Sequence, residues 1–268
     1  MFDKLDASII QQNLNTQFIG QQIHIFQTLE STNSELRKFI HQNTPVGTVV
    51  MAEYQTGGKG RRKRKWIAPE NSSLLFSVFL EPEILVEQSH VLTVLMTLAV
   101  VRMARRLANI ELDIIWPNDV YYQGAKLCGV LTEGFLRGGM LSKAIIGCGL
   151  NVHQNGDALN LSDRQTTSLD VLTKRKNSRS IIAAILFNEL EEIYYQFQNK
   201  GAEFIVQLWM QNCPMIGKQV GLQLKAKTIK GKMMGINECG HLKVKDANDE
   251  IHIFQDGEVV EVDHAALY

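Results

Sequence analysis

The sequence has few of the features that mark a secreted, membrane-bound or metal-bound protein. Its four cysteines form no Cys-x-x-Cys pair and show no metal-ligand spacing with histidine, so neither disulfides nor a metal held by protein side chains alone is expected. The longest apolar run, residues 91–107, is interrupted by three arginines, and no signal peptide is recognised. These absences predict a protein with reduced thiols that is cytoplasmic and has no membrane partner.

The chain also has a formal net charge of zero at pH 7. The 28 Lys and Arg residues balance the 28 Asp and Glu residues, whereas a nucleic-acid-binding domain is usually basic overall, so no nucleic-acid partner is expected. Hydrophobic residues make up 45% of the chain, which is ordinary for a globular protein. A length of 268 residues suffices for one large domain and one small domain.

One segment, residues 55–66, departs from this even balance. Six of the seven residues from Lys59 to Lys65 are cationic, and three glycines lie within or just before them. Glycine N–H groups and guanidinium forks suit a phosphate, and the indole of Trp66 suits a flat base. The Gly-x-x-x-x-Gly-Lys-Ser/Thr order of a P-loop is not present. We expect a mobile loop that folds over a phosphorylated ligand; a localisation signal, a nucleic-acid patch and a solvated turn are the alternatives.

Predicted strands dominate the first 150 residues. They are expected at residues 23–26, 47–54, 74–80 and 143–152. The basic segment therefore connects two neighbouring strands of one sheet. Connections of this length are usually functional or disordered.

Two helix starts carry polar signals. Thr32 and Glu35 have the spacing of a capping box, which predicts that a helix begins there. A helix N-terminus is also a donor-rich site for a small ligand, so the same residues suit binding. Ser89 is expected to cap a long apolar core helix over residues 90–107.

A predicted hairpin around residues 123–124 brings a carboxylate and an amine together. Asp119 and Lys126 fall on consecutive paired strands, where they form either an exposed salt bridge of little energetic value or part of a site. Gly129, inside the second strand, suggests the close approach of a ligand or of backbone. Asn151, at the end of the strand over 143–152, suggests a ligand or a simple turn.

The hydrophobic period changes near Pro214. Helices are expected over residues 178–198 and 202–211, and beyond them five short alternating segments indicate a small barrel. This change divides the chain into residues 1–213 and residues 214–268.

Five motifs, in this order, resemble those of biotin–protein ligases. They are Ser31-Thr32-Asn33, Glu53 to Arg62, Trp116-Pro117-Asn118-Asp119, Lys126-Leu127-Cys128-Gly129 and Gly147-Cys148-Gly149-Leu150-Asn151. The resemblance runs from about residue 23 to the end of the sequence. It implies an α+β fold, with a mixed sheet and helices like those of class II aminoacyl-tRNA synthetases, followed by a small SH3-like β-barrel.

The resemblance also implies a two-step ATP-dependent reaction. Biotin's carboxylate attacks the α-phosphate of ATP, which binds with Mg²⁺, to give biotinyl-5′-adenylate and pyrophosphate. A lysine of the biotin carboxyl carrier domain of a carboxylase then displaces AMP. The family is compatible with a homodimer.

Particular residues receive roles from this resemblance. The catalytic candidates are Lys126, which should contact the biotin carboxylate and the α-phosphate, Asp119, which should orient or deprotonate the acceptor lysine, and Arg61. The biotin-binding candidates are Ser31, Thr32, Asn33, Gln55, Gly58, Lys59, Gly129 and Gly147. The candidates for ATP and the adenylate are Lys59, Arg61, Arg62, Arg64, Trp66, Asn118, Lys126 and Asn151.

The sequence departs from the family pattern at three positions. Lys59 stands where arginine is commoner, which keeps the charge but loses the fork. Lys63 replaces a usual glycine, and Ile115 replaces a usual lysine. Some family members also carry an N-terminal DNA-binding domain; because about 20 residues precede the first predicted strand, a ligase without DNA-binding activity is expected.

Two other functions compete with this assignment. Lipoate–protein ligases and octanoyltransferases resemble the chain around Asn118-Asp119 and Lys126, but they typically carry an Arg-Arg-x-Ser-Gly-Gly-Gly segment that is absent here. A non-enzymatic nucleic-acid or anion-binding module would use residues 59–65 and would bind in a salt-sensitive way. That second alternative leaves the Trp-Pro-Asn-Asp motif and Lys126 unexplained.

Overall fold

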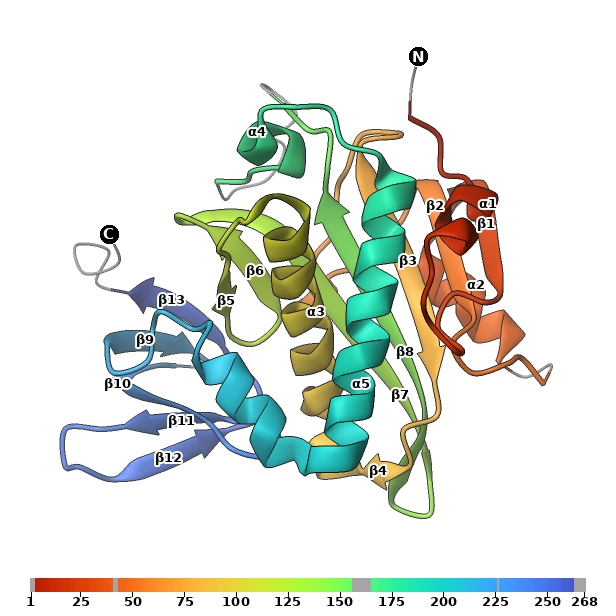
Figure 1. Ribbon diagram of the computed structural model, residues 1–268. Coiled ribbons are helices and arrows are strands. Elements are labelled where there is room, and N and C mark those ends of the chain that lie inside the picture. The colour runs from red at the N-terminus through yellow and green to blue at the C-terminus, as the bar shows by residue number, and fades with distance from the viewer. Residues whose placement is uncertain (1–2, 41–42, 156–164, 226, 263–268) are drawn as a thin grey trace.

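The larger part of the protein is built on an eight-stranded mixed sheet (Figure 1). The computed structural model describes residues 3–40, 43–155, 165–225 and 227–262. The sheet order is β1-β2-β3-β8-β7-β6-β5, with β4 paired to β8. β1 runs parallel to β2, and the other neighbours pair antiparallel. The strands are β1 (Ile23–Leu29), β2 (Val49–Gln55), β3 (Ser73–Leu80), β4 (Ile84–Leu85), β5 (Asp113–Ile115), β6 (Asp119–Tyr122), β7 (Ala125–Arg137) and β8 (Met140–Asn151).

Apolar side chains that alternate along the strands bury both faces of this sheet. One face packs on α3 (His90–Ala108) and α5 (Arg179–Met210), which lie side by side in Figure 1. The opposite face packs on α2 (Thr32–Phe39), through Leu36, Val50 and Phe79 among others. Because side chains alternate with period 2, Met51 faces the first layer and Val50 the second.

The two helices expected over residues 178–198 and 202–211 are both present, as the two parts of α5. They are separated by a kink at Gly201, whose φ of +78° falls in the left-handed region. The cap expected at Ser89 is not formed in the described structure. Ser89 lies in helical backbone at the end of a 3-10 turn (Val86–Ser89), and among the described residues its side chain receives no capping hydrogen bond. The incoming turn continues into the helix, so no separate cap is needed.

The predicted capping box at the start of α2 is also wrong. Ser31 is the residue that precedes the helix, and in the described structure its side chain makes no cap bond, while Glu35 pairs with Lys38 at 2.6 Å. Thr32 is instead the first helical residue and bonds Gln55 of β2. The hydroxyls at this helix start are therefore turned toward the sheet rather than used as caps.

A separate five-stranded antiparallel sheet follows α5, as the alternating pattern predicted. Its order is β12-β11-β10-β9-β13. The strands are β9 (Gln219–Gln223), β10 (Thr228–Ile236), β11 (Leu242–Lys245), β12 (Ile251–Phe254) and β13 (Glu258–Val262). This barrel contacts the larger sheet where Trp116 Nε1 donates to the Gly240 carbonyl at 3.1 Å. The domain boundary at 213/214 stays a prediction.

Short elements complete the described chain. They are α1 (Ala7–Gln12), the 3-10 turn of residues Arg61–Lys63 and α4 (Leu169–Thr173). Within the part of the chain that the structure describes, none of the helices combines the length and apolar character needed to cross a bilayer.

Candidate active site

A cavity of about 710 Å³ lies between the large sheet, the basic loop and the barrel. That volume is typical of small-molecule sites. Residues of all five sequence motifs line the cavity. The predicted residues that line it are Ser31, Thr32, Asn33, Gln55, Lys59, Arg61, Arg62, Arg64, Trp66, Asn118, Asp119, Lys126, Gly129, Gly147 and Asn151.

Gly58 is the predicted site residue that falls outside this lining in the described structure. Its carbonyl accepts a hydrogen bond from the Trp66 N–H at 2.9 Å. A Cβ at position 58 would lie 2.5 Å from the Trp66 carbonyl oxygen. The glycine is therefore required by close packing of backbone against backbone.

One end of the cavity is polar and uncharged. The Gln55 Oε1 atom accepts from the Thr32 N–H at 2.7 Å, and the Ser77 hydroxyl lies 2.7 Å from Thr32 Oγ1 and 2.6 Å from Asn33 Oδ1. Ser31, Thr32 and Asn33 are all buried. Sequence reasoning missed Ser77, although a serine inside the apolar run of β3 was a signal.

Glycines make room for side chains on the cavity face of β7 and β8. A Cβ at Gly147 would lie 2.2 Å from Asn33 Oδ1, and one at Gly149 would lie 2.5 Å from the Trp66 ring. A Cβ at Gly129 would lie 3.0 Å from the same ring. The glycines of the two strands thus let Trp66 lie flat against the sheet.

Lys126 and Asp119 form an ion pair in the wall of the cavity. Lys126 Nζ lies 2.7 Å from Asp119 Oδ2 and 5.6 Å from the centre of the Trp66 ring. The side chains are only 20% and 11% exposed, so the alternative of a solvated hairpin salt bridge does not describe this pair. Asn118 supports the hairpin through a 2.8 Å bond from Nδ2 to the Val130 carbonyl.

The basic loop contacts acidic residues of the barrel. Arg61 lies 2.6 Å and Arg62 3.1 Å from the carboxylate of Asp256, and Arg64 pairs with Glu258. Burial acts to raise the pKa of Asp256, but Arg62 and Arg61 lower it overall, so the carboxylate stays charged. The sequence-based expectation of a mobile loop did not include these carboxylates. Nothing in the local sequence signalled that Glu258 would line the cavity.

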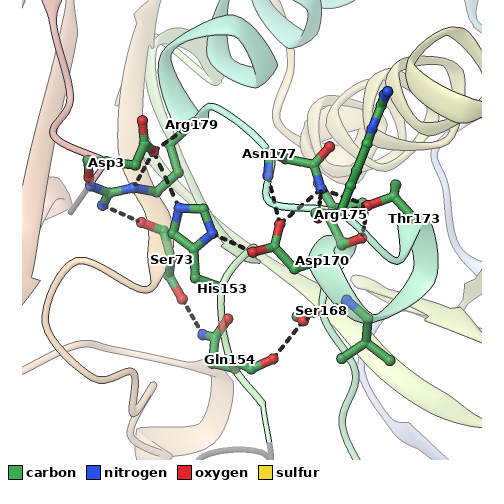
Figure 2. A network of polar contacts seen from close by, with 12 residues as sticks. Asp3, Ser73, His153, Gln154, Ser168, Asp170, Thr173, Arg175, Asn177 and Arg179 are labelled. Atoms are coloured by element: carbon green, nitrogen blue, oxygen red, sulfur yellow. Dashed lines mark hydrogen bonds and ion pairs between the residues drawn. The ribbon is translucent and has the colours of Figure 1, made fainter. Parts of the chain in front are cut away.

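A buried arginine organises the polar network shown in Figure 2. Arg179, at the start of α5, lies 2.6 Å from Glu53 Oε2 and 3.2 Å from Asp3 Oδ2; the contact with Glu53 is an ion pair without hydrogen-bond alignment. His153 bridges Asp3 at 3.2 Å and Asp170 at 2.7 Å. The network fixes the segment that follows Asn151 in the cavity wall.

This network makes stability depend on pH. Burial acts to lower the pKa of His153, but hydrogen bonds to Asp3 and Asp170 outweigh it and raise the pKa above the usual 6.5. A raised folded-state pKa adds stability that is complete below about pH 6.5 and is lost as the pH rises through the folded value. His153→Gln should therefore lower the free energy of unfolding more at pH 6 than at pH 9, by at most about 1 kcal/mol because the pair is partly exposed.

Urea unfolding of His153→Gln and of wild type at both pH values measures this difference. His24→Gln, on β1 and outside the network, is the matched control for the replacement of histidine by glutamine. A larger loss at pH 9 than at pH 6 would contradict the assignment of a charged His153.

Comparisons with known proteins agree with the fold and the cavity. The model of the biotin/lipoate A/B protein ligase family matches residues 25–151, which carry most of the cavity lining. The large mixed sheet and most of the cavity lining therefore fall within the region that matches this family of protein-modifying ligases.

Individual relatives narrow the assignment. The chain is 32% identical to the bifunctional ligase/repressor BirA of Bacillus subtilis, over 89% of this chain and 74% of that protein. It is 28% identical to the biotin–[acetyl-CoA-carboxylase] ligase of Mycobacterium tuberculosis, over 94% of this chain and 98% of that protein. The structure of biotin protein ligase from Aquifex aeolicus in complex with biotin and ATP is 28% identical, covers 90% of this chain and 98% of its own, and superimposes with a TM-score of 0.75. The chain belongs to the biotin–protein ligases.

Proposed function

We propose that the protein forms biotinyl-5′-adenylate from biotin and magnesium–ATP and transfers the biotinyl group to a lysine of a carboxylase's biotin carboxyl carrier domain. The observation that carries this proposal is that Lys126, paired with Asp119, lines one cavity together with uncharged polar side chains and with the cationic side chains of the basic loop. The Aquifex aeolicus ligase of similar fold holds biotin and ATP together, which supports two adjoining ligand sites here.

The uncharged end suits the ureido group of biotin. A urea presents two N–H donors and one carbonyl acceptor, and Ser31, Thr32, Asn33 and Gln55 offer hydroxyl and amide partners for both. Because these groups are buried, a neutral ligand group is favoured: moving a charged group from water into a buried site would cost much more free energy.

Adenylation then requires charge stabilisation at the α-phosphorus. A biotin carboxylate oxygen forms a bond to phosphorus while the bond to pyrophosphate breaks. Lys126 lies where its ammonium neutralises both the attacking carboxylate and the phosphate oxygens, and Arg61, Arg62 and Arg64 suit the leaving pyrophosphate. Such positioned cations act without a covalent enzyme intermediate.

The transfer step needs a neutral amine. The acceptor lysine loses a proton, attacks the acyl carbon, and AMP leaves with the pair of electrons from the broken anhydride bond. Asp119, next to Lys126 in the cavity wall, is the carboxylate that we assign to orient this amine and take its proton.

ATP–pyrophosphate exchange with purified protein and magnesium tests the proposed function. We expect exchange that depends on biotin and is not supported by lipoate or octanoate. Exchange with lipoate alone would place the activity with the lipoate ligases. The absence of exchange with every acid would contradict adenylation.

Arg61→Gly should loosen retention of the adenylate. Arg61 lines the cavity and is tied to Asp256, so its loss removes both a phosphate ligand and an anchor of the loop. We expect escape of the adenylate to rise by about tenfold or more, because a charge-assisted contact contributes about 1.5–3 kcal/mol. Biotinylation of free lysine or of bystander proteins measures the escape.

Lys63→Gly is the matched control for that variant. Lys63 is exposed, lies outside the cavity lining as described, and has a φ of +62° that glycine adopts without strain. The Lys63→Gly variant introduces a glycine into the same loop without removing a cavity-lining guanidinium. Equal adenylate escape from both variants would assign the effect to loop flexibility instead of Arg61.

A further inference from the structure

The side-chain amide of Asn33, at the uncharged end of the cavity, has a fixed orientation. Its Nδ2 atom donates to the carboxylate of Glu133 at 3.2 Å and to the Leu131 carbonyl at 3.3 Å. A carboxylate and a carbonyl only accept hydrogen bonds. If the amide turned over, its oxygen would face both of these acceptors, so Nδ2 must point toward β7.

The orientation of Asn33 sets the direction of a chain of hydrogen bonds. Asn33 Oδ1 lies 2.6 Å from the Ser77 hydroxyl, so the single proton of Ser77 is donated to this oxygen. Ser77 Oγ lies 2.7 Å from Thr32 Oγ1, and the proton between these two oxygens must therefore come from Thr32. Gln55 Oε1, 3.2 Å from the Thr32 hydroxyl, accepts instead from the Thr32 N–H at 2.7 Å. Both hydroxyl protons thus have defined positions before a ligand binds.

Glu133 begins this chain from outside the described lining of the cavity. Its second carboxylate oxygen accepts from Arg37 of α2, whose guanidinium also lies 5.0 Å from the centre of the Phe135 ring. The Glu133 side chain is 23% exposed, whereas the residues further along the chain are buried. A charged acceptor at the more exposed end of the chain therefore orients the neutral groups in its buried part.

We propose that Glu133 is a positioning residue for biotin: by orienting Asn33, it preorganises the hydrogen-bond chain at the uncharged end of the cavity. The inference rests on the proposed function, because it concerns the part of the cavity assigned there to the ureido group. Asn33 and Thr32 line the cavity, whereas Glu133 acts through them. Preorganised groups bind a ligand more tightly, because they lose less freedom on binding.

The experiment makes Arg37 and Asn33 compete for one acceptor oxygen. The carboxylate of Glu133 offers an oxygen to each of these two donors, whereas the amide of Glu133→Gln has only one oxygen. Adding Arg37→Ala to Glu133→Gln leaves that single oxygen to Asn33. Binding of biotin without nucleotide is measured by isothermal titration calorimetry for wild type, both single variants and the double variant. Glu35→Gln, which neutralises a carboxylate paired with Lys38 on α2, is the matched control.

Glu133→Gln should weaken biotin binding by about 10-fold or more, because a buried amide is left without its acceptor. Arg37→Ala and Glu35→Gln should stay within about twofold of wild type, since each removes only a partly exposed ion pair, and the double variant should recover to within about threefold. In biotin-dependent pyrophosphate exchange, Glu133→Gln should raise KM for biotin and leave kcat nearly unchanged, because the ureido end is bound equally in the ground state and the transition state. A merely structural role of Glu133 would give no recovery on addition of Arg37→Ala.

Several results would overturn the inference. Wild-type affinity in Glu133→Gln does so, and so does a double variant that binds biotin as weakly as Glu133→Gln alone. Ser77→Ala cuts the same chain and serves if Glu133→Gln does not fold: it should weaken biotin binding by about 10-fold, and unchanged affinity would again overturn the inference. If wild type binds biotin with the expected pattern among the variants but shows no exchange with ATP, the proposed adenylation fails while the role of Glu133 stands.

Discussion

Lys126→Ala is expected to lower the rate of biotin-dependent ATP–pyrophosphate exchange by about 100- to 1000-fold. This is the typical effect on an enzyme when one preorganised group that stabilises the developing negative charge is removed. Lys126, on β7, lines the cavity, pairs with Asp119 and lies over the ring of Trp66. Without it, two negatively charged reactants, the biotin carboxylate and the α-phosphate, must approach each other unscreened in a partly buried site.

Lys143→Ala on the neighbouring strand β8 is the matched control. Lys143 is 40% exposed and pairs with Glu81 at 3.7 Å, outside the described lining of the cavity. Both variants should keep the wild-type far-ultraviolet circular dichroism and a cooperative unfolding transition. Near-wild-type exchange by folded Lys126→Ala would contradict its role as the adenylation cation.

Asp119→Asn separates the two chemical steps. If Asp119 serves the acceptor amine, this variant retains pyrophosphate exchange and transfers biotin to the carrier domain more slowly. The defect should shrink as the pH rises, because more of the acceptor lysine is then already neutral. Exchange and transfer reduced by the same factor would instead assign Asp119 to the positioning of Lys126.

Arg179→Met is expected to lower the free energy of unfolding by about 3–5 kcal/mol, since it leaves a buried carboxylate without its counter-ion. Arg179 is fully buried between Glu53, which is 3% exposed, and Asp3. Its Nη1 also donates to the Ser73 carbonyl at 3.2 Å, so the same substitution releases the N-terminal segment from β3 and α5.

Urea unfolding with Arg105→Met as a control measures this effect. Arg105 pairs with Glu111 at the surface, where both side chains are about half exposed or more, and its loss should cost less than about 1 kcal/mol. Glu53→Leu combined with Arg179→Met should recover much of the lost stability, because it removes the stranded charge. A loss below about 1 kcal/mol in Arg179→Met alone would contradict the structural role of this ion pair.

Local patterns in the sequence determined the strands, the hairpin and the order of the site motifs. The apolar run at residues 74–80 predicted β3, because a strand buried on both faces is apolar at every position. The alternation of apolar and polar residues beyond Pro214 predicted the barrel strands, because a strand buried on one face is apolar at every second position. The hairpin around 123–124 placed Asp119 and Lys126 on paired strands, and the structure joins them at 2.7 Å. The two residues are only a few positions apart in the sequence, so the hairpin between them fixes their proximity.

Local signals failed at two helix starts. Thr32 has the spacing of a capping residue, yet it bonds Gln55, which lies on a strand 23 residues later. Here a contact that forms only in the folded chain displaces the local one, and the local sequence carries no record of that choice. Ser89 precedes a helix, yet the incoming 3-10 turn makes its cap unnecessary.

The tertiary structure alone decided how the ends of the chain complete the site. Arg61 meets Asp256, 195 residues away, and Arg179 meets Asp3, 176 residues away. The fold also brings the Gln154 amide nitrogen to Ser73, 81 residues earlier in the chain. The sequence determined which residues carry charge and where the strands begin. Which charges pair was decided by the packing of the barrel and of α5 on the sheet, because contacts between residues this far apart produce no local pattern in the sequence.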